Sequence, residues 1–87
     1  MANLKAIELV DGIATPCNLD GRQYNATGTG VVDIYGISIG STTYEKLFTL
    51  TVSGTAVSQR SSDLHPVIKG VITSGAPKFN VQGFERF

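Results

Sequence analysis

Apolar and polar residues alternate along much of the chain with the two-residue period of β-strands. The pattern is clearest in two segments, 29–39 and 44–52. In the second of these, Tyr44, Phe48 and Val52 fall on one face, and Thr49 and Thr51 on the other. Because β-branched and aromatic residues dominate both segments, they favour strands over helices. Further β-prone segments are predicted at 4–10, 13–19, 55–59, 67–73 and 79–87, with a polar loop over 60–63.

Glycine-containing turns separate these segments. Asp-Gly pairs at 11–12 and 20–21 lie between β-prone runs, and Asp-Gly favours a tight hairpin turn. They predict a three-stranded meander over residues 4–27. Gly36, inside a long apolar run, indicates a β-bulge or the tight bend of a coiled barrel strand. With no helical stretch, we expect one all-β domain over 1–87: a small OB-like barrel of about five to seven antiparallel strands, or alternatively a sandwich.

The same alternation predicts which side chains form the hydrophobic core, because one face of each strand must be buried. The predicted core residues are Ile7, Leu9, Ile13, Val32, Ile34, Phe48, Leu50, Val52, Ile68, Ile72 and Val81.

Charge limits the kinds of partner that the protein can have. Seven basic and seven acidic residues give a formal net charge of zero, which argues against binding to nucleic acid or anionic lipid by bulk charge. Charged residues make up 16% of the chain, against a usual quarter, so we expect another copy or a partner to cover part of the surface. We predict no secretory signal and no membrane partner. The expected location is the cytoplasm, that of a host cell if the protein is viral, or a virion.

Few side chains could support catalysis or metal binding. Cys17 is the single cysteine, which excludes an internal disulfide and favours a small core residue. His65, the single histidine, follows Ser61, Ser62 and Asp63, but a catalytic triad is usually assembled from distant segments. The simpler interpretation is a polar connection. We therefore expect no enzyme, no catalytic residue, no cofactor and no metal.

Binding through the surface is the remaining prediction. Small β-barrels bind single strands with aromatic platforms beside basic side chains. Arg22 and Tyr24 lie two residues apart and would share a strand face, as would Tyr44 and Lys46. Tyr35 and Phe79 are further platform candidates, and Arg86 is a further cation. The predicted nucleic-acid contacts are Arg22, Tyr24, Tyr44, Lys46, Lys69 and Lys78.

Several short motifs add a family resemblance. They are Gly-Arg-Gln-Tyr at 21–24, Val-Val-Asp-Ile-Tyr-Gly at 31–36, Leu-Phe-Thr-Leu at 47–50 and His-Pro at 65–66. In this order the chain resembles, over 21–87, the small OB-fold single-stranded-DNA-binding proteins of filamentous phages. The resemblance implies a homodimer that coats single strands cooperatively, with Arg22 and Tyr24 as strand contacts.

The leading expectation is thus a non-enzymatic, phage-like protein that binds single-stranded DNA or RNA as a homo-oligomer. The alternative is a small structural or assembly protein, such as a viral coat, decoration or tail component, without nucleic-acid binding. The sparse charge and the apolar segment 84–87, a candidate docking segment, favour this alternative. An Sm-like RNA-binding oligomer ranks lower, because the first helix of that fold is not predicted.

Overall fold

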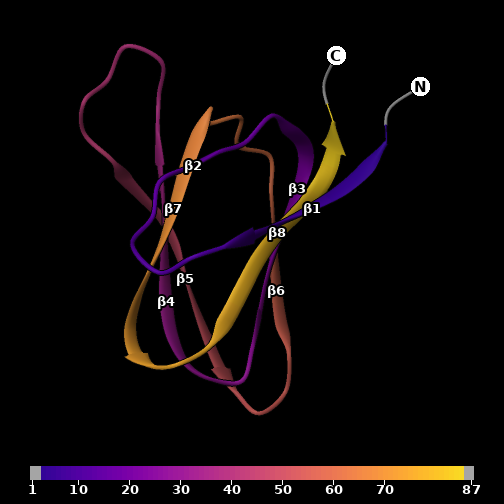
Figure 1. Ribbon diagram of the computed structural model, residues 1–87, viewed down its shortest axis with the longest axis vertical. Coiled ribbons are helices and arrows are strands. Elements are labelled where there is room, and N and C mark those ends of the chain that lie inside the picture. The colour runs from indigo at the N-terminus through magenta and orange to yellow at the C-terminus, as the bar shows by residue number, and fades with distance from the viewer. Residues whose placement is uncertain (1–2, 86–87) are drawn as a thin grey trace.

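The computed structural model describes residues 3–85 and contains only β-strands and their connections in this range (Figure 1). The strands are β1 (Leu4–Leu9), β2 (Thr15–Pro16), β3 (Leu19–Thr27), β4 (Thr29–Ile37), β5 (Glu45–Ser53), β6 (Val57–Ser61), β7 (Val67–Gly75) and β8 (Lys78–Glu85). The all-β class is confirmed, whereas five to seven strands was too low a count for this part of the chain. No helix that could cross a membrane occurs in the described residues.

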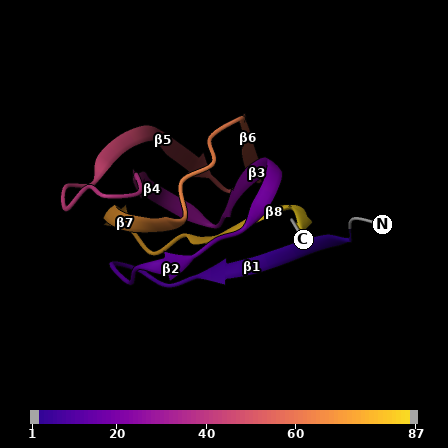
Figure 2. The ribbon, with the colours of Figure 1, turned by 90° about the horizontal axis from the view of Figure 1, so that it is seen from above.

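The strands form two four-stranded antiparallel sheets, in the orders β1-β8-β3-β6 and β2-β7-β4-β5 (Figures 1 and 2). The pairs β1–β8, β2–β7, β3–β6 and β4–β5 are nested, as in one long hairpin. Lateral pairs β3–β8 and β4–β7 show that this hairpin is rolled up. This nesting is the strand order of a jelly roll. Between residues 3 and 85 no ladder joins the two sheets into a closed barrel.

The inner faces of the two sheets share one hydrophobic core. Tyr24 of β3 packs edge-on against Phe48 of β5, with ring centroids 5.1 Å apart. Twelve apolar side chains are buried in this core: Leu9, Cys17, Leu19, Tyr24, Ala26, Val32, Ile34, Leu50, Val52, Ile68, Phe79 and Val81. Most predicted core positions are therefore confirmed, and Ile7, Phe48 and Ile72 are partly buried against the core.

Ile13 is the one predicted core residue that the structure places outside, with 55% of its surface exposed. It follows a turn in which its own N–H donates to the carbonyl of Val10 at 3.0 Å. The strand that follows, β2, begins at Thr15 and is only two residues long. Ile13 therefore lies before the strand and belongs to neither sheet, in contrast to the predicted strand over 13–19.

The predicted meander over residues 4–27 is wrong, because none of its three segments pairs with another. The turn at 11–12 instead packs on β7, where Gly12 N–H donates to Gly70 O at 2.7 Å and Ile72 N–H donates to the Asp11 carboxylate at 2.7 Å. The second Asp-Gly pair lies inside β3 as a bulge, where the register with β8 shifts between Asp20 and Gln23. Gly21 has a φ of 60°, the backbone conformation that glycine favours both in bulges and in hairpin turns.

Candidate functional site

The structure buries two of the six predicted nucleic-acid contacts. Arg22 and Tyr24 share one face of β3, as expected, but it is the inner face, and they are 1% and 0% exposed. The alternation that placed them together also applies to Ala26, which is buried as well. Leu19 is buried although it lies three residues before Arg22, because the bulge between Asp20 and Gln23 interrupts the alternation. Neither side chain is available as a surface contact in this structure.

Arg22 is held by backbone carbonyls and one carboxylate. Its Nε–H donates to Leu19 O at 2.8 Å, and one terminal nitrogen donates to Cys17 O at 3.1 Å and His65 O at 2.8 Å. The other terminal nitrogen donates to Asp63 Oδ1 at 2.6 Å. A buried guanidinium needs both a counter-charge and hydrogen-bond acceptors, and the segments before β3 and after β6 supply them.

Asp63 is the centre of this polar cluster. Its carboxylate accepts hydrogen bonds from Tyr24 Oη at 3.1 Å and Ser61 Oγ at 2.5 Å. Burial of Asp63 opposes ionisation, but the hydrogen bonds of Ser61 and His65 and the charge of Arg22 outweigh it and hold the pKa of this carboxyl below its usual value. Burial raises the pKa of Tyr24. The cluster therefore contains a carboxylate and a neutral phenol at physiological pH.

His65 lies between two carboxylates. Its Nδ1 is 3.0 Å from Asp63 Oδ1, and its Nε2 is 2.7 Å from Glu45 Oε1. A neutral imidazole can donate only one hydrogen bond, so donation to both carboxylates requires the charged form. Burial disfavours that charge, yet the two hydrogen bonds and the two negative charges raise the pKa of His65 overall. The ring packs on β4, where a Cβ added to Gly36 would lie 2.6 Å from the imidazole Cγ.

This arrangement differs from a catalytic triad. In a triad the imidazole nitrogen that faces away from the carboxylate contacts a nucleophile, whereas here it contacts Glu45. The hydroxyl of Ser61 donates to Asp63 instead. Within residues 3–85 no group of His, Cys, Asp and Glu side chains has the arrangement of a metal site. The cluster links β3, the β6–β7 connection and the start of β5.

The charged form of His65 predicts a pH-dependent stability. Folding raises the pKa of His65, so the charged imidazole stabilises the folded state fully at any pH below the unfolded-state pKa of about 6.5. This stabilisation is lost as the pH rises through the pKa of the folded state. A charge-assisted hydrogen bond contributes about 1.5–3 kcal/mol, and the exposure of Glu45 reduces this towards about 1 kcal/mol. We expect the melting temperature to be about 4–8 °C lower at alkaline pH than at pH 6.

Two measurements check this expectation. The single imidazole resonance in an NMR titration reports the pKa of His65 directly, and melting scans across the same pH range report the stability. Glu45→Gln is the matched control, because an amide can hydrogen-bond to either form of the imidazole. In this variant the melting temperature should fall less between pH 6 and alkaline pH than in the wild type. An imidazole that titrates at or below 6.5 would contradict the proposed charge.

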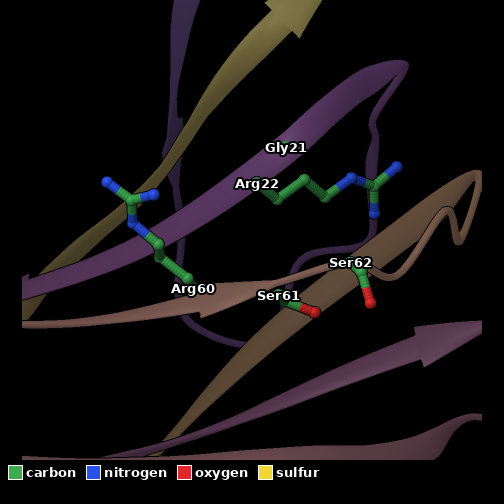
Figure 3. A pocket seen from close by; sticks show the side chains of 5 residues that line it. All are labelled: Gly21, Arg22, Arg60, Ser61 and Ser62. Atoms are coloured by element: carbon green, nitrogen blue, oxygen red, sulfur yellow. The ribbon is translucent and has the colours of Figure 1, made fainter.

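A pocket of about 370 Å³ lies beside the cluster, lined by Gly21, Arg22, Arg60, Ser61 and Ser62. Figure 3 shows that the guanidinium groups of Arg22 and Arg60 point away from each other. The Arg22 group is already bound to Asp63 and three carbonyls. The two arginines therefore do not converge on a common anion.

Three of the predicted contacts meet on the outer face of the second sheet. Tyr35 of β4 is paired with Lys69 of β7 on one side and with Lys46 of β5 on the other. The ammonium of Lys69 lies 4.1 Å from the ring centroid of Tyr44 and 6.0 Å from that of Tyr35. We call Lys69, Tyr35, Lys46 and Tyr44 the aromatic–lysine row. Lys46 also lies 3.6 Å from Asp33 Oδ2, which leaves Lys69 as the cation of the row that contacts rings.

The remaining predicted residues lie elsewhere. Lys78 begins β8 in the other sheet and lines a pocket of about 120 Å³ with Glu8, Asn25 and Asn80 among others. Phe79 is buried and offers no platform for a base. Arg86 and part of the segment 84–87 lie outside the described residues.

The aromatic–lysine row was only half predicted from the sequence. Tyr44 and Lys46 were paired by their spacing. That Tyr35 lies beside Lys69 depends on the register between two strands, and these two residues are 34 positions apart in the sequence.

Comparisons of the chain with protein-family models, curated proteins and solved structures find no match.

Proposed function

We propose that the protein is a non-enzymatic homo-oligomer that binds single-stranded nucleic acid through the outer face of β7, β4 and β5. The observation that supports this proposal is the aromatic–lysine row, in which an ammonium lies beside two tyrosine rings. Bases stack on such rings, and the ammonium can then reach a phosphate of the same strand. The protein would act in the cytoplasm of a host cell, or in a virion if it is viral.

The binding face differs from the one expected by resemblance to the phage proteins. Arg22 and Tyr24 take no part in it, because both are buried. An OB-like barrel also stays a prediction, and the proposal does not require one, since an open sheet face carries the row. Tyr44, Lys46 and Lys69 are the contacts that remain from the sequence-based prediction.

The small number of cations implies weak binding by a single copy. Two lysines that neutralise two phosphates give a slope of log affinity against log salt of about −1.4 for a single strand. Base stacking contributes about 1–3 kcal/mol per base, by alanine substitution. Tight binding would therefore require several copies along one strand, and for this reason the proposal includes a homo-oligomer.

Tyr44→Ala is expected to weaken binding of a labelled oligo-dT by about 5- to 150-fold, the equivalent of one lost stacking contact. The measurement is fluorescence anisotropy at low and at near-physiological salt. Lys69→Ala should weaken binding and make the salt slope shallower by about 0.7.

Lys78→Ala is the matched control, since it removes the same charge from the other sheet. It should leave the affinity nearly unchanged. Equal losses for Lys69→Ala and Lys78→Ala would indicate unspecific charge attraction and contradict the site. A flat titration of the wild type at low salt would refute strand binding altogether.

A structural or assembly role is the second candidate, and a specific observation favours it. Leu4 and Phe84 stand opposite each other at the open end of the first sheet and are 64% and 50% exposed. Contiguous exposed apolar surface marks places that another subunit covers, and this pair is a candidate for the start of such a surface. A fixed oligomer that shows no affinity for oligonucleotides would support this role over strand binding.

A further inference from the structure

Strand β1 is an open sheet edge. It pairs with β8 along its whole length, and it is the first strand in the order of its sheet. The other edge strands are β2 with two residues, β6 with five and β5 with nine. Edge strands β5 and β6 follow one another in the chain and contact each other, so among the described strands β1 is the edge whose extensive contacts are with its own ladder partner, β8, alone.

The hydrogen-bonding groups on this edge can be assigned to particular residues. Glu85 N–H donates to Asn3 O at 2.9 Å, which makes residues 3 and 85 a hydrogen-bonded pair of the antiparallel ladder. Because hydrogen-bonded and non-hydrogen-bonded pairs alternate, Lys5 and Ile7 also bond to β8. The N–H and C=O groups of Leu4, Ala6 and Glu8 then point away from β8, towards the open side.

Strand β1 has two charged side chains, Lys5 and Glu8, which lie on either side of its centre. Edge strands are commonly protected from pairing by an exposed lysine. The one lysine of β1, Lys5, is drawn back to its own sheet, where its ammonium lies 3.4 Å from Glu85 Oε2. The centre of the strand, Ala6, is exposed, small and uncharged.

We propose that β1 pairs antiparallel with β1 of a second copy, about a two-fold axis at Ala6. This register places Ala6 opposite the partner's Ala6 and Leu4 opposite the partner's Glu8, and forms about six backbone hydrogen bonds. Lys5 then faces the partner's Ile7, so that no two like charges stand opposite each other. Two copies of the strand can therefore pair without a repulsive side-chain contact, and at zero formal net charge the copies do not repel as a whole.

The interface would join two four-stranded sheets into one continuous sheet of eight strands with an isologous contact. It extends the homo-oligomeric part of the proposed function, because it names the surface through which copies associate. The aromatic–lysine row lies on the other sheet, so pairing through β1 leaves it accessible on both copies.

A charge exchange at the two-fold axis tests the proposal. In a dimer of the Ala6→Lys variant two lysines would stand opposite each other, and in a dimer of the Ala6→Glu variant two glutamates would. Like charges directly opposite each other destabilise a strand pair. Each variant alone should be monomeric at concentrations at which the wild type is dimeric. An equimolar mixture of the two should form the heterodimer, because the lysine then faces a glutamate. With one variant uniformly labelled with ¹⁵N, native mass spectrometry resolves the two homodimers and the heterodimer; the label is needed because lysine and glutamate residues have nearly the same mass.

Ala56→Lys and Ala56→Glu are matched controls, since Ala56 is exposed outside the strands and should leave the dimer intact. Amide exchange gives a second readout: the N–H groups of Leu4, Ala6 and Glu8 should exchange at least tenfold more slowly in the dimer, while those of Lys5 and Ile7 are protected in the monomer too. A monomeric wild type, dimeric single variants, or variants that do not associate when mixed would overturn the proposal. None of these readouts contains nucleic acid, so a failure of strand binding leaves the result unaffected.

Discussion

Asp63→Ala is expected to lower the free energy of unfolding by about 3–5 kcal/mol, because it leaves a buried charge without its partner. The side chain of Arg22 is fully buried, and within residues 3–85 its one ion pair is with Asp63. The same change removes the acceptor of Tyr24 and Ser61. A domain of this size has a total stability of about 5–15 kcal/mol, so the variant should lose a large share of it and unfold at a clearly lower urea concentration than the wild type.

Urea denaturation followed by far-UV circular dichroism measures this loss. Glu45→Ala, at pH 8, is the matched control: it removes another carboxylate next to His65, but one that is 63% exposed, and it should cost less than about 1 kcal/mol. A loss below about 1 kcal/mol for Asp63→Ala would mean that water or rearranged side chains stabilise the Arg22 charge. In that case the cluster would not be what fixes the β6–β7 connection to β3.

The positions of the strands could be predicted from alternation, but their pairing could not. Alternation is a local property, and it identified the core faces of the segments that form β4 and β7 and that of β5 from Phe48 onwards. Before Phe48 the register with β4 shifts, and Lys46 lies on the outer face, opposite to the face that alternation predicted. The nested pairs join segments from opposite ends of the chain, such as β1 with β8. Turn signals describe neighbours in sequence, so the two Asp-Gly pairs were interpreted as hairpins although one lies in a bulge and the other on β7.

The buried cluster was missed for a related reason. Alternation shows that Arg22 and Tyr24 share a face, but it does not show which face is inside, and charge suggested the outside. The counter-charge comes from Asp63, 41 residues further along. The spacing of Ser61, Asp63 and His65, each two residues apart, was the available signal, because such residues share one face of an extended chain. The side chains of Ser61 and His65 do converge, on the Asp63 carboxylate that also binds Arg22.

Gly30→Ala is expected to be the second strongly destabilising substitution, with a loss of about 2–6 kcal/mol from overpacking and backbone strain together. Gly30 is the second residue of β4 and pairs with Gly75 of β7. Both residues lie next to the connections, β3–β4 and β7–β8, by which the chain passes from one sheet to the other. Its φ is 148°, and an added Cβ would collide with the carbonyl oxygen of Ser74 and lie 2.7 Å from Pro77 Cδ. These neighbours are backbone and a proline ring, which cannot move aside without opening the β4–β7 ladder.

Gly54→Ala separates the two causes of this loss. Gly54 also has a positive φ, 87°, but no atom lies within 4 Å of its added Cβ, so it should show the backbone cost alone, about 1–3 kcal/mol. Melting temperatures of the two variants measure the difference, at about 4–8 °C for each kcal/mol. If both variants melt together, the close approach of β4 and β7 at Gly30 and Gly75 is not a constraint on the fold. If Gly30→Ala melts well below Gly54→Ala, the crossing between the sheets requires a residue without a side chain at this position.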